Sequence, residues 1–127
     1  MLKKHNPKSI APPVAAYSHG MEAPPGARWL FISGQLGMLP DGTVPDEPVA
    51  QIEAAYANFK AVLESAAMGP DDIVRLNVYV TSADLVPLSL AARAKVLGDI
   101  EPAQTGVVAA LRYPEWIIEV EGVAAAT

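Results

Sequence analysis

Two glutamates near the carboxyl end of the chain have the spacing of paired acid–base groups. Glu119 and Glu121 stand two residues apart in Ile118-Glu119-Val120-Glu121, so on a strand both side chains point to the same face. Two carboxylates can divide the roles of acid and base when their surroundings differ. The same alternation is also typical of a solvated strand face, and the pattern alone leaves both interpretations open.

A serine and a glycine follow an aromatic-rich apolar run in Phe31-Ile32-Ser33-Gly34-Gln35. A glycine such as Gly34 lets backbone N–H groups approach a ligand closely. A hydrolase nucleophile elbow would also need glycines two residues before and two residues after Ser33, where Phe31 and Gln35 stand. The segment therefore indicates a ligand-contacting strand exit, or a glycine-rich strand end without a ligand, rather than a catalytic triad.

Four further side chains could contact a ligand. Tyr17 and His19 share one face if their segment is extended, and a tyrosine hydroxyl can orient a substrate, although an amphipathic wall residue is its commoner role. Gln104 offers both a donor and an acceptor. Arg112 carries a guanidinium that suits a carboxylate, although an arginine at the surface of a loop is the simpler interpretation.

The composition narrows the class of protein. The chain has 127 residues, of which 51% are hydrophobic and 18% charged, which predicts one domain over residues 1–127 with a substantial core. The absence of cysteine excludes disulfides, thiolate zinc sites and a cysteine nucleophile. A formal net charge of −5 disfavours nucleic acid as a partner. We expect no metal, no cofactor, no membrane span and, by default, a cytoplasmic location. The first ten residues predict a frayed, solvated terminus without a targeting signal.

Two segments have the periodicity of amphipathic helices. Apolar residues recur at intervals of three and four from Glu47 to Ala67, and Asp46 is the expected cap. A second helix is expected from Asp84 to Leu97, with Pro87 tolerated in its first turn. The residues predicted to face the core from this second helix are Leu85, Leu88, Ala91, Ala92 and Val96.

The rest of the pattern predicts strands. They are expected over residues 28–33, 73–81, 105–111 and 116–124, with a weaker one over 14–19. In the second of these, Val74, Leu76, Val78 and Val80 alternate with polar residues and should face the core. The order β-β-α-β-α-β-β predicts an α+β fold with a mixed sheet and two helices on one face.

Two helices can cover only one face of such a sheet, yet some strands are apolar on both faces. Trp29 and Phe31 alternate with Leu30 and Ile32, whereas a sheet that faces water on one side should carry polar residues there. Because an exposed apolar sheet face promotes association, we expect copies of the chain to cover it for one another.

Taken in order along nearly the whole chain, these segments resemble the Rid/YjgF family. The resemblance is carried by Tyr17, Ile32-Ser33-Gly34-Gln35, the amphipathic helix, Val78-Tyr79-Val80, Pro102-Ala103 and Ile118-Glu119-Val120-Glu121. It implies a chorismate-mutase-like fold assembled as a homotrimer, with small-molecule clefts between subunits.

The resemblance also implies an activity. Family archetypes hydrolyse enamines and imines, such as 2-iminopropanoate, to a keto acid and ammonia. It assigns Glu119 to placing the attacking water and Tyr17, Ser33 and Gly34 to lining the cleft. The archetype's Pro-Ala-Arg motif, whose arginine holds the substrate carboxylate, is Pro102-Ala103-Gln104 here.

This departure leaves the function open. Gln104 cannot supply the charge of a bidentate arginine–carboxylate pair, and Arg112 lies eight residues further along the strand, too far to substitute within one extended segment. Two hypotheses follow. The chain is a deaminase that holds its substrate differently, or it is a metabolite-binding trimer without catalysis or a different hydrolase. A third hypothesis, an interaction protein or nuclease, is disfavoured by the acidic net charge.

Overall fold

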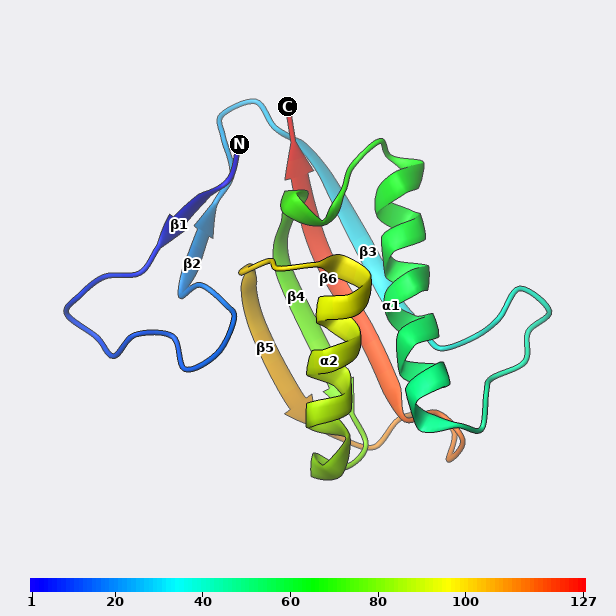
Figure 1. The fold of residues 1–127 in the computed structure, drawn as a ribbon. Helices are drawn as coiled ribbons and strands as arrows, with labels where there is room; N and C mark the ends of the chain where they lie inside the picture. The colour runs from blue at the N-terminus through cyan, green and yellow to red at the C-terminus, as the bar shows by residue number, and fades with distance from the viewer.

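Both helices lie on one face of a four-stranded sheet, as the computed structural model of residues 1–127 shows (Figure 1). The elements are β1 (Lys3–His5), β2 (Gly20–Glu22), β3 (Arg28–Leu36), α1 (Pro48–Ser65), β4 (Ile73–Val80), α2 (Val86–Leu97), β5 (Ala103–Val108) and β6 (Ile118–Ala126), with short 3₁₀ turns at Pro70–Asp72 and Ala83–Leu85. The expected α+β class and the single helical layer are confirmed.

The sheet is mixed and has the strand order β3-β6-β4-β5. β6 pairs antiparallel with both β3 and β4, whereas β4 and β5 run parallel and are joined by the α2 crossover. The two edges of the sheet are therefore β3 and β5, which lie on opposite sides in Figure 1. β1 and β2 form a separate two-stranded sheet.

The helix α1 forms as its periodicity predicts, one residue from the expected cap. Its N-cap is Glu47 rather than Asp46, because the Glu47 carboxylate accepts hydrogen bonds from the backbone N–H groups of Val49 (3.1 Å) and Ala50 (2.7 Å). Pro48 is tolerated at the first helical position because no intrahelical bond is lost there. The buried side chains of this helix are Gln51, Ile52, Ala55, Tyr56, Phe59 and Leu63.

The buried face of α2 agrees only in part with the predicted one. Ala92 is buried and Leu85 and Val96 pack against the core as predicted, but Leu88 is 37% exposed and Ala91 is exposed, and Ser89, Arg93 and Leu97 are buried as well. The helix is rotated because two polar side chains find partners inside: Ser89 and the Tyr56 hydroxyl form a buried hydrogen bond (2.8 Å), and Arg93 bonds to backbone carbonyls described below.

The amino-terminal residues correct two further predictions. The segment predicted to be frayed contains β1, which pairs with β2, and Lys4 forms an ion pair with Glu101 (2.6 Å) that ties it to the body of the protein. Residues 14–19, predicted as a weak strand, form a loop. Its one ladder contact is the parallel bridge between Ser18 and Ala103. These contacts join residues far apart in sequence, so local patterns do not reveal them.

The core lies between the helices and the inner face of the sheet. Leu76, Val78 and Val80 are buried there as predicted, but a register shift between Ile73 and Arg75 makes Ile73, rather than Val74, the buried residue at the start of β4. None of the helices is long and apolar enough to cross a bilayer.

The opposite face of the sheet has no covering element. Phe31 is 76% exposed, Trp29 53% and Val107 41%. Trp29 and Phe31 point away from the helices because they alternate with Leu30 and Ile32, which face inward. Val107 points the same way as its ladder partner Tyr79, which alternates with the buried Val78 and Val80. We call this surface the open face.

Gly122 is required for the close packing of α1 on β6. A Cβ built at this position would lie 2.9 Å from Cζ of Phe59 and closer still to the carbonyl oxygen of Arg75. Because both neighbours are buried or backbone atoms, Gly122→Ala should lower the free energy of unfolding by about 1–3 kcal/mol, measured by urea denaturation. Gly69→Ala, where a Cβ meets nothing within 4 Å, is the matched control, and equal stability of the two variants would contradict this packing.

Candidate functional site

The two glutamates of β6 lie on the open face, as predicted, in different surroundings. Glu121 accepts hydrogen bonds from the Tyr79 hydroxyl (2.7 Å) and from the Asn77 amide (3.3 Å). The hydrogen bond to Glu121 raises the pKa of Tyr79, because ionising the phenol would break that bond and place two negative charges together. Glu121 is thus held in place by its neighbours.

Glu119 accepts no hydrogen bond within the chain, and its carboxylate lies directly against Gly34 on the neighbouring strand β3. A Cβ at position 34 would lie 2.7 Å from Cδ of Glu119 and closer still to Oε2. The glycine therefore makes room for this carboxylate. Gly34 and Glu119, which the sequence singled out separately, thus lie side by side in the fold. The Glu119 carboxylate keeps its acceptor sites free for a ligand or a water molecule.

Ser33 precedes Gly34 at an irregularity of β3, where the register with β6 shifts between Ile32 and Gln35. The exposed Ser33 side chain borders a depression of about 320 Å³ on the open face, together with Asn77 and Glu121. The Oδ1 atom of Asn77 is buried beneath this surface without a hydrogen-bond partner.

Tyr17 and Gln104 line a second cavity, at the β5 edge of the sheet. We call it the cationic cavity; its volume is about 460 Å³. Its lining includes Tyr17, Ser18, His19, Arg75, Arg93 and Gln104. The Tyr17 and His19 rings meet edge to face at 5.8 Å. His19 Nε2 donates a hydrogen bond to the Ala11 carbonyl (2.7 Å).

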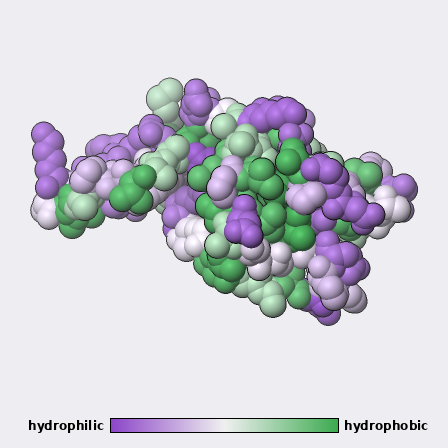
Figure 2. All heavy atoms as spheres, turned by 60° about the horizontal axis from the view of Figure 1, so that its bottom comes forward, coloured by the Kyte–Doolittle hydropathy of each residue, from purple (hydrophilic) through white to green (hydrophobic).

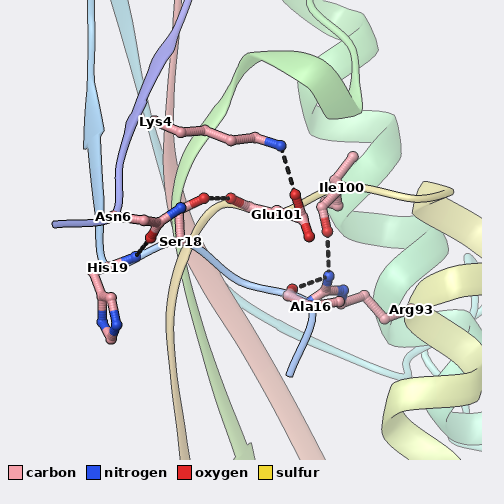
Figure 3. A network of polar contacts seen from close by, with 8 residues as sticks. All are labelled: Lys4, Asn6, Ala16, Ser18, His19, Arg93, Ile100 and Glu101. Carbon is pink, nitrogen blue, oxygen red and sulfur yellow. Dashed lines mark hydrogen bonds and ion pairs between the residues drawn. The ribbon is translucent and has the colours of Figure 1, made fainter. Parts of the chain in front are cut away.

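Arg93, which the sequence pattern did not single out, is only 5% exposed. Its guanidinium reaches from α2 to the carbonyl oxygens of Ala16 (2.7 Å) and Ile100 (2.5 Å), in the network of Figure 3. Burial lowers the pKa of Arg93. Arg93 lies four residues from both Ser89 and Leu97, so its helical position is that of a core residue. That spacing is the signal that could have identified it.

Arg93 also fixes the orientation of the Gln104 side-chain amide. Its Nη1 donates to Oε1 of Gln104, and because a guanidinium only donates, the amide oxygen of Gln104 must face it. The Gln104 NH₂ group then points away from Arg93. An arginine at position 104, as in the archetype, would meet the buried Arg93 guanidinium at close range, which explains physically why a neutral side chain stands here.

The predicted site residues form two separate groups on one protomer. Ser33 and Gly34 lie on β3 and Glu119 on its neighbour β6, whereas Tyr17 and Gln104 lie at the β5 edge. β5 is two strand spacings from β6, about 10 Å, and three from β3, about 14 Å. Gln104 also shares its row with the buried Leu76, on the helix side, whereas Glu119 points to the open face. One copy of the chain therefore does not bring the two groups into contact.

Two other candidates lie elsewhere. Arg112 is exposed in the loop after β5, where it borders a depression with Tyr113 and Trp116, and it does not line the cationic cavity. No group of three or more histidine, aspartate or glutamate side chains is arranged to hold a metal ion.

Comparison with known proteins identifies the family to which the chain belongs. Residues 8–126 match the model of the family described as endoribonuclease L-PSP. The Rid-family protein YyfB from Yersinia pestis, described as of unknown function, has a TM-score of 0.83 at 32% identity, with 98% of each chain covered. RidA from a Psychrobacter species has a TM-score of 0.72 at 26% identity, with 90% of this chain and 91% of that chain covered.

Two curated proteins are similar to the chain in sequence. Protein HMF1 from Saccharomyces cerevisiae is 29% identical over 112 residues, which are 87% of this chain and 84% of that protein. A RutC family protein from Pyrococcus horikoshii is 26% identical over 118 residues, 88% of each chain. The fold is thus that of the small α+β proteins named Rid, RutC and YjgF. The chain is a member of the Rid/YjgF family.

The contact between Gly34 and Glu119 can be tested directly. Gly34→Ala should displace the Glu119 carboxylate while leaving the fold intact, because the group that must move is the far end of a flexible side chain. A crystal structure of the variant should show a changed Glu119 rotamer, with thermal stability close to that of the parent protein. An unmoved carboxylate would contradict the arrangement described here.

Proposed function

We propose that the protein hydrolyses a small imine or enamine to a carbonyl compound and ammonia, in clefts formed between the subunits of a homotrimer. The observation that carries the proposal is the free carboxylate of Glu119 against Gly34, since the resemblance assigns the water-placing role to this glutamate. The family membership and the intact Tyr17, Ser33 and Gly34 support it.

The separate positions of the two residue groups support a shared cleft. If the β3 side of one copy meets the β5 edge of the next, Glu119 approaches the Tyr17 and Gln104 of its neighbour. Such a head-to-tail contact uses two different surfaces and closes into a ring at a suitable rotation. The exposed Phe31 and Trp29 favour association of this kind, because it removes apolar surface from water.

In the proposed reaction, an enamine first tautomerises to the imine. Glu119 accepts a proton from a water molecule as the water oxygen attacks the imine carbon, the C=N double bond becomes a single bond, and its electron pair passes to nitrogen, which takes up the proton that Glu119 received. In the resulting carbinolamine the hydroxyl group gives its proton to Glu119, the C=O bond forms as the C–N bond breaks, and the nitrogen takes up that proton and leaves as ammonia. Each turnover consumes one water and releases one ammonia, with no oxidant or cofactor required.

A second candidate function is metabolite binding without turnover. It is favoured by one observation, the presence of Gln104 at the position where the archetype holds its substrate carboxylate with arginine. The family name endoribonuclease is supported less well, because the chain has a net charge of −5, which does not attract a phosphate backbone.

The role of Glu119 predicts a specific loss of activity. Glu119→Gln should lower the rate of ammonia release from imines generated in situ by about 10²–10⁴-fold, because the amide cannot take the proton from water. Glu64→Gln, on the exposed surface of α1, should retain the parent rate. Unchanged ammonia release by Glu119→Gln would contradict the proposal, and absence of release by the parent protein on any imine would favour the binding function.

The shared cleft predicts complementation between two defective variants. Glu119→Gln removes the carboxylate from one side of the cleft, and Tyr17→Ala removes the tyrosine side chain from the other. Each variant alone should therefore be inactive. When the two are unfolded, mixed equally and refolded, about one quarter of the clefts should join two intact sides, restoring about a quarter of the parent activity. No recovery in refolded mixtures of confirmed mixed composition would mean that the two sides do not come from different copies.

A further inference from the structure

The position of Glu119 depends on its backbone, because no group of the chain holds its carboxylate by a hydrogen bond. The β3–β6 ladder beside it is interrupted between Ile32 and Gln35, next to Gly34. A ladder is locally disrupted at such an irregularity. Two ladder pairs follow the interruption, Gln35 with Val120 and Leu36 with Glu119. Contacts from outside the sheet are therefore needed to fix the strand ends that meet at Glu119.

Gln51 of α1 supplies such contacts to the start of β6. The residue is only 2% exposed. Its Nε2 donates to the carbonyl oxygens of Pro45 (3.0 Å) and Glu115 (3.1 Å), and its Oε1 accepts a hydrogen bond from the Ile117 N–H (2.8 Å). Both amide protons are thereby used. Glu115 and Ile117 lie four and two positions before Glu119, so this one amide holds the backbone that leads into β6.

These contacts lie at one end of the molecule. In Figure 1 the starts of α1 and β6 lie together at the lower end, and Figure 2, which brings that end forward, shows many apolar residues there. Because Gln51 is buried, water cannot replace a partner that is lost, and each backbone group it releases would stay without a hydrogen bond.

Asn58 makes the corresponding contacts to the end of β3. It lies seven residues after Gln51, about two helical turns along the same side of α1. Its Nδ2 donates to the carbonyl oxygens of Leu36 and Met38, both at 2.8 Å. Leu36 is the ladder partner of Glu119. The two amides of α1 thus hold the backbone on both sides of the contact between Gly34 and Glu119.

The loop after β3 also packs directly on Gln51. Gly37 is buried, and a Cβ there would lie 2.6 Å from Cγ of Gln51 and closer still to its carbonyl oxygen. The absence of a side chain at this position lets the loop lie against the first turns of α1. The end of β3 and the start of β6 are therefore fixed to the same part of one helix.

We propose that Gln51 and Asn58 are positioning residues, which hold the Glu119 carboxylate in the geometry that its reaction requires. The inference rests on the proposed function, in which Glu119 takes the proton of the attacking water. A catalytic group must be held within about 0.5 Å of its productive position, and a displacement of about 1 Å can lower a rate about a hundredfold. Loss of either amide therefore lowers turnover without removing any group assigned to the cleft.

The experiment is a double-mutant cycle on the full-length protein, with kcat and KM measured for ammonia release from an imine generated in situ. Gln51→Met, which keeps the length of the side chain and removes its amide, should lower kcat about ten- to hundredfold and change KM less than about twofold. In the Glu119→Gln background the same change should have little further effect, since no carboxylate remains to be positioned. A merely structural role would lower the folded fraction, and with it the rate, equally in both backgrounds.

Two further variants complete the set. Asn58→Ala removes the second amide at a half-buried position where alanine favours the helix. It should lower kcat in the same background-dependent way, and it tests the inference even if Gln51→Met does not fold. Val62→Ala removes apolar packing, and no hydrogen bond, from the same helix. As the matched control, it should lower thermal stability and keep the parent kcat.

Crystal structures of the two amide variants test the positioning independently of turnover. The Glu119 carboxylate should be displaced from its place against Gly34 in both. An unmoved carboxylate in both variants, an equal loss of rate in the two backgrounds, or a loss of kcat in Val62→Ala as large as in Gln51→Met would each overturn the inference. A displaced carboxylate in a protein whose parent form hydrolyses no imine would overturn the proposed deaminase and leave the positioning of Glu119 standing.

Discussion

The structure depends on one constraint: two helices are packed on one face of a four-stranded sheet, and nothing in the chain covers the other. The open face carries Phe31 and Trp29 largely exposed, beside a polar centre in which Glu121 is held by Tyr79. Association of copies removes this apolar surface from water. In the proposed assembly, the same association would bring Glu119 of one copy to Gln104 of the next, so covering the apolar surface and completing the cleft would depend on one contact.

A second feature, the buried Arg93, connects parts of the chain that are distant in sequence. It joins α2 to the loop at Ala16 and to Ile100 before β5, and it sets the orientation of Gln104. Where the archetype has an arginine, this chain has a neutral amide whose oxygen accepts a hydrogen bond from the Arg93 guanidinium. The change at one position is understandable only with the residues that face it.

The local parts of the fold could be predicted from the sequence and the long-range parts could not. The spacing around Phe59 and the cap at the start of α1 are local signals, and that helix formed within a residue or two of its prediction. β1 depends on Lys4 reaching Glu101 across the chain, which no local pattern records. Glu119 and Gly34 were singled out separately, and only the strand pairing places one against the other. Arg93 was missed because an arginine in a helix is usually solvated, and its burial is decided by carbonyls from distant segments.

The central claim is that copies of the chain cover the open face for one another, and sedimentation equilibrium at micromolar concentration tests it most directly. The account predicts a single species of three times the protomer mass of 13.3 kDa, and a shift toward smaller species for Phe31→Glu, which places a charge in the covered surface. A well-behaved lone protomer of the unmodified chain at that concentration would contradict the account.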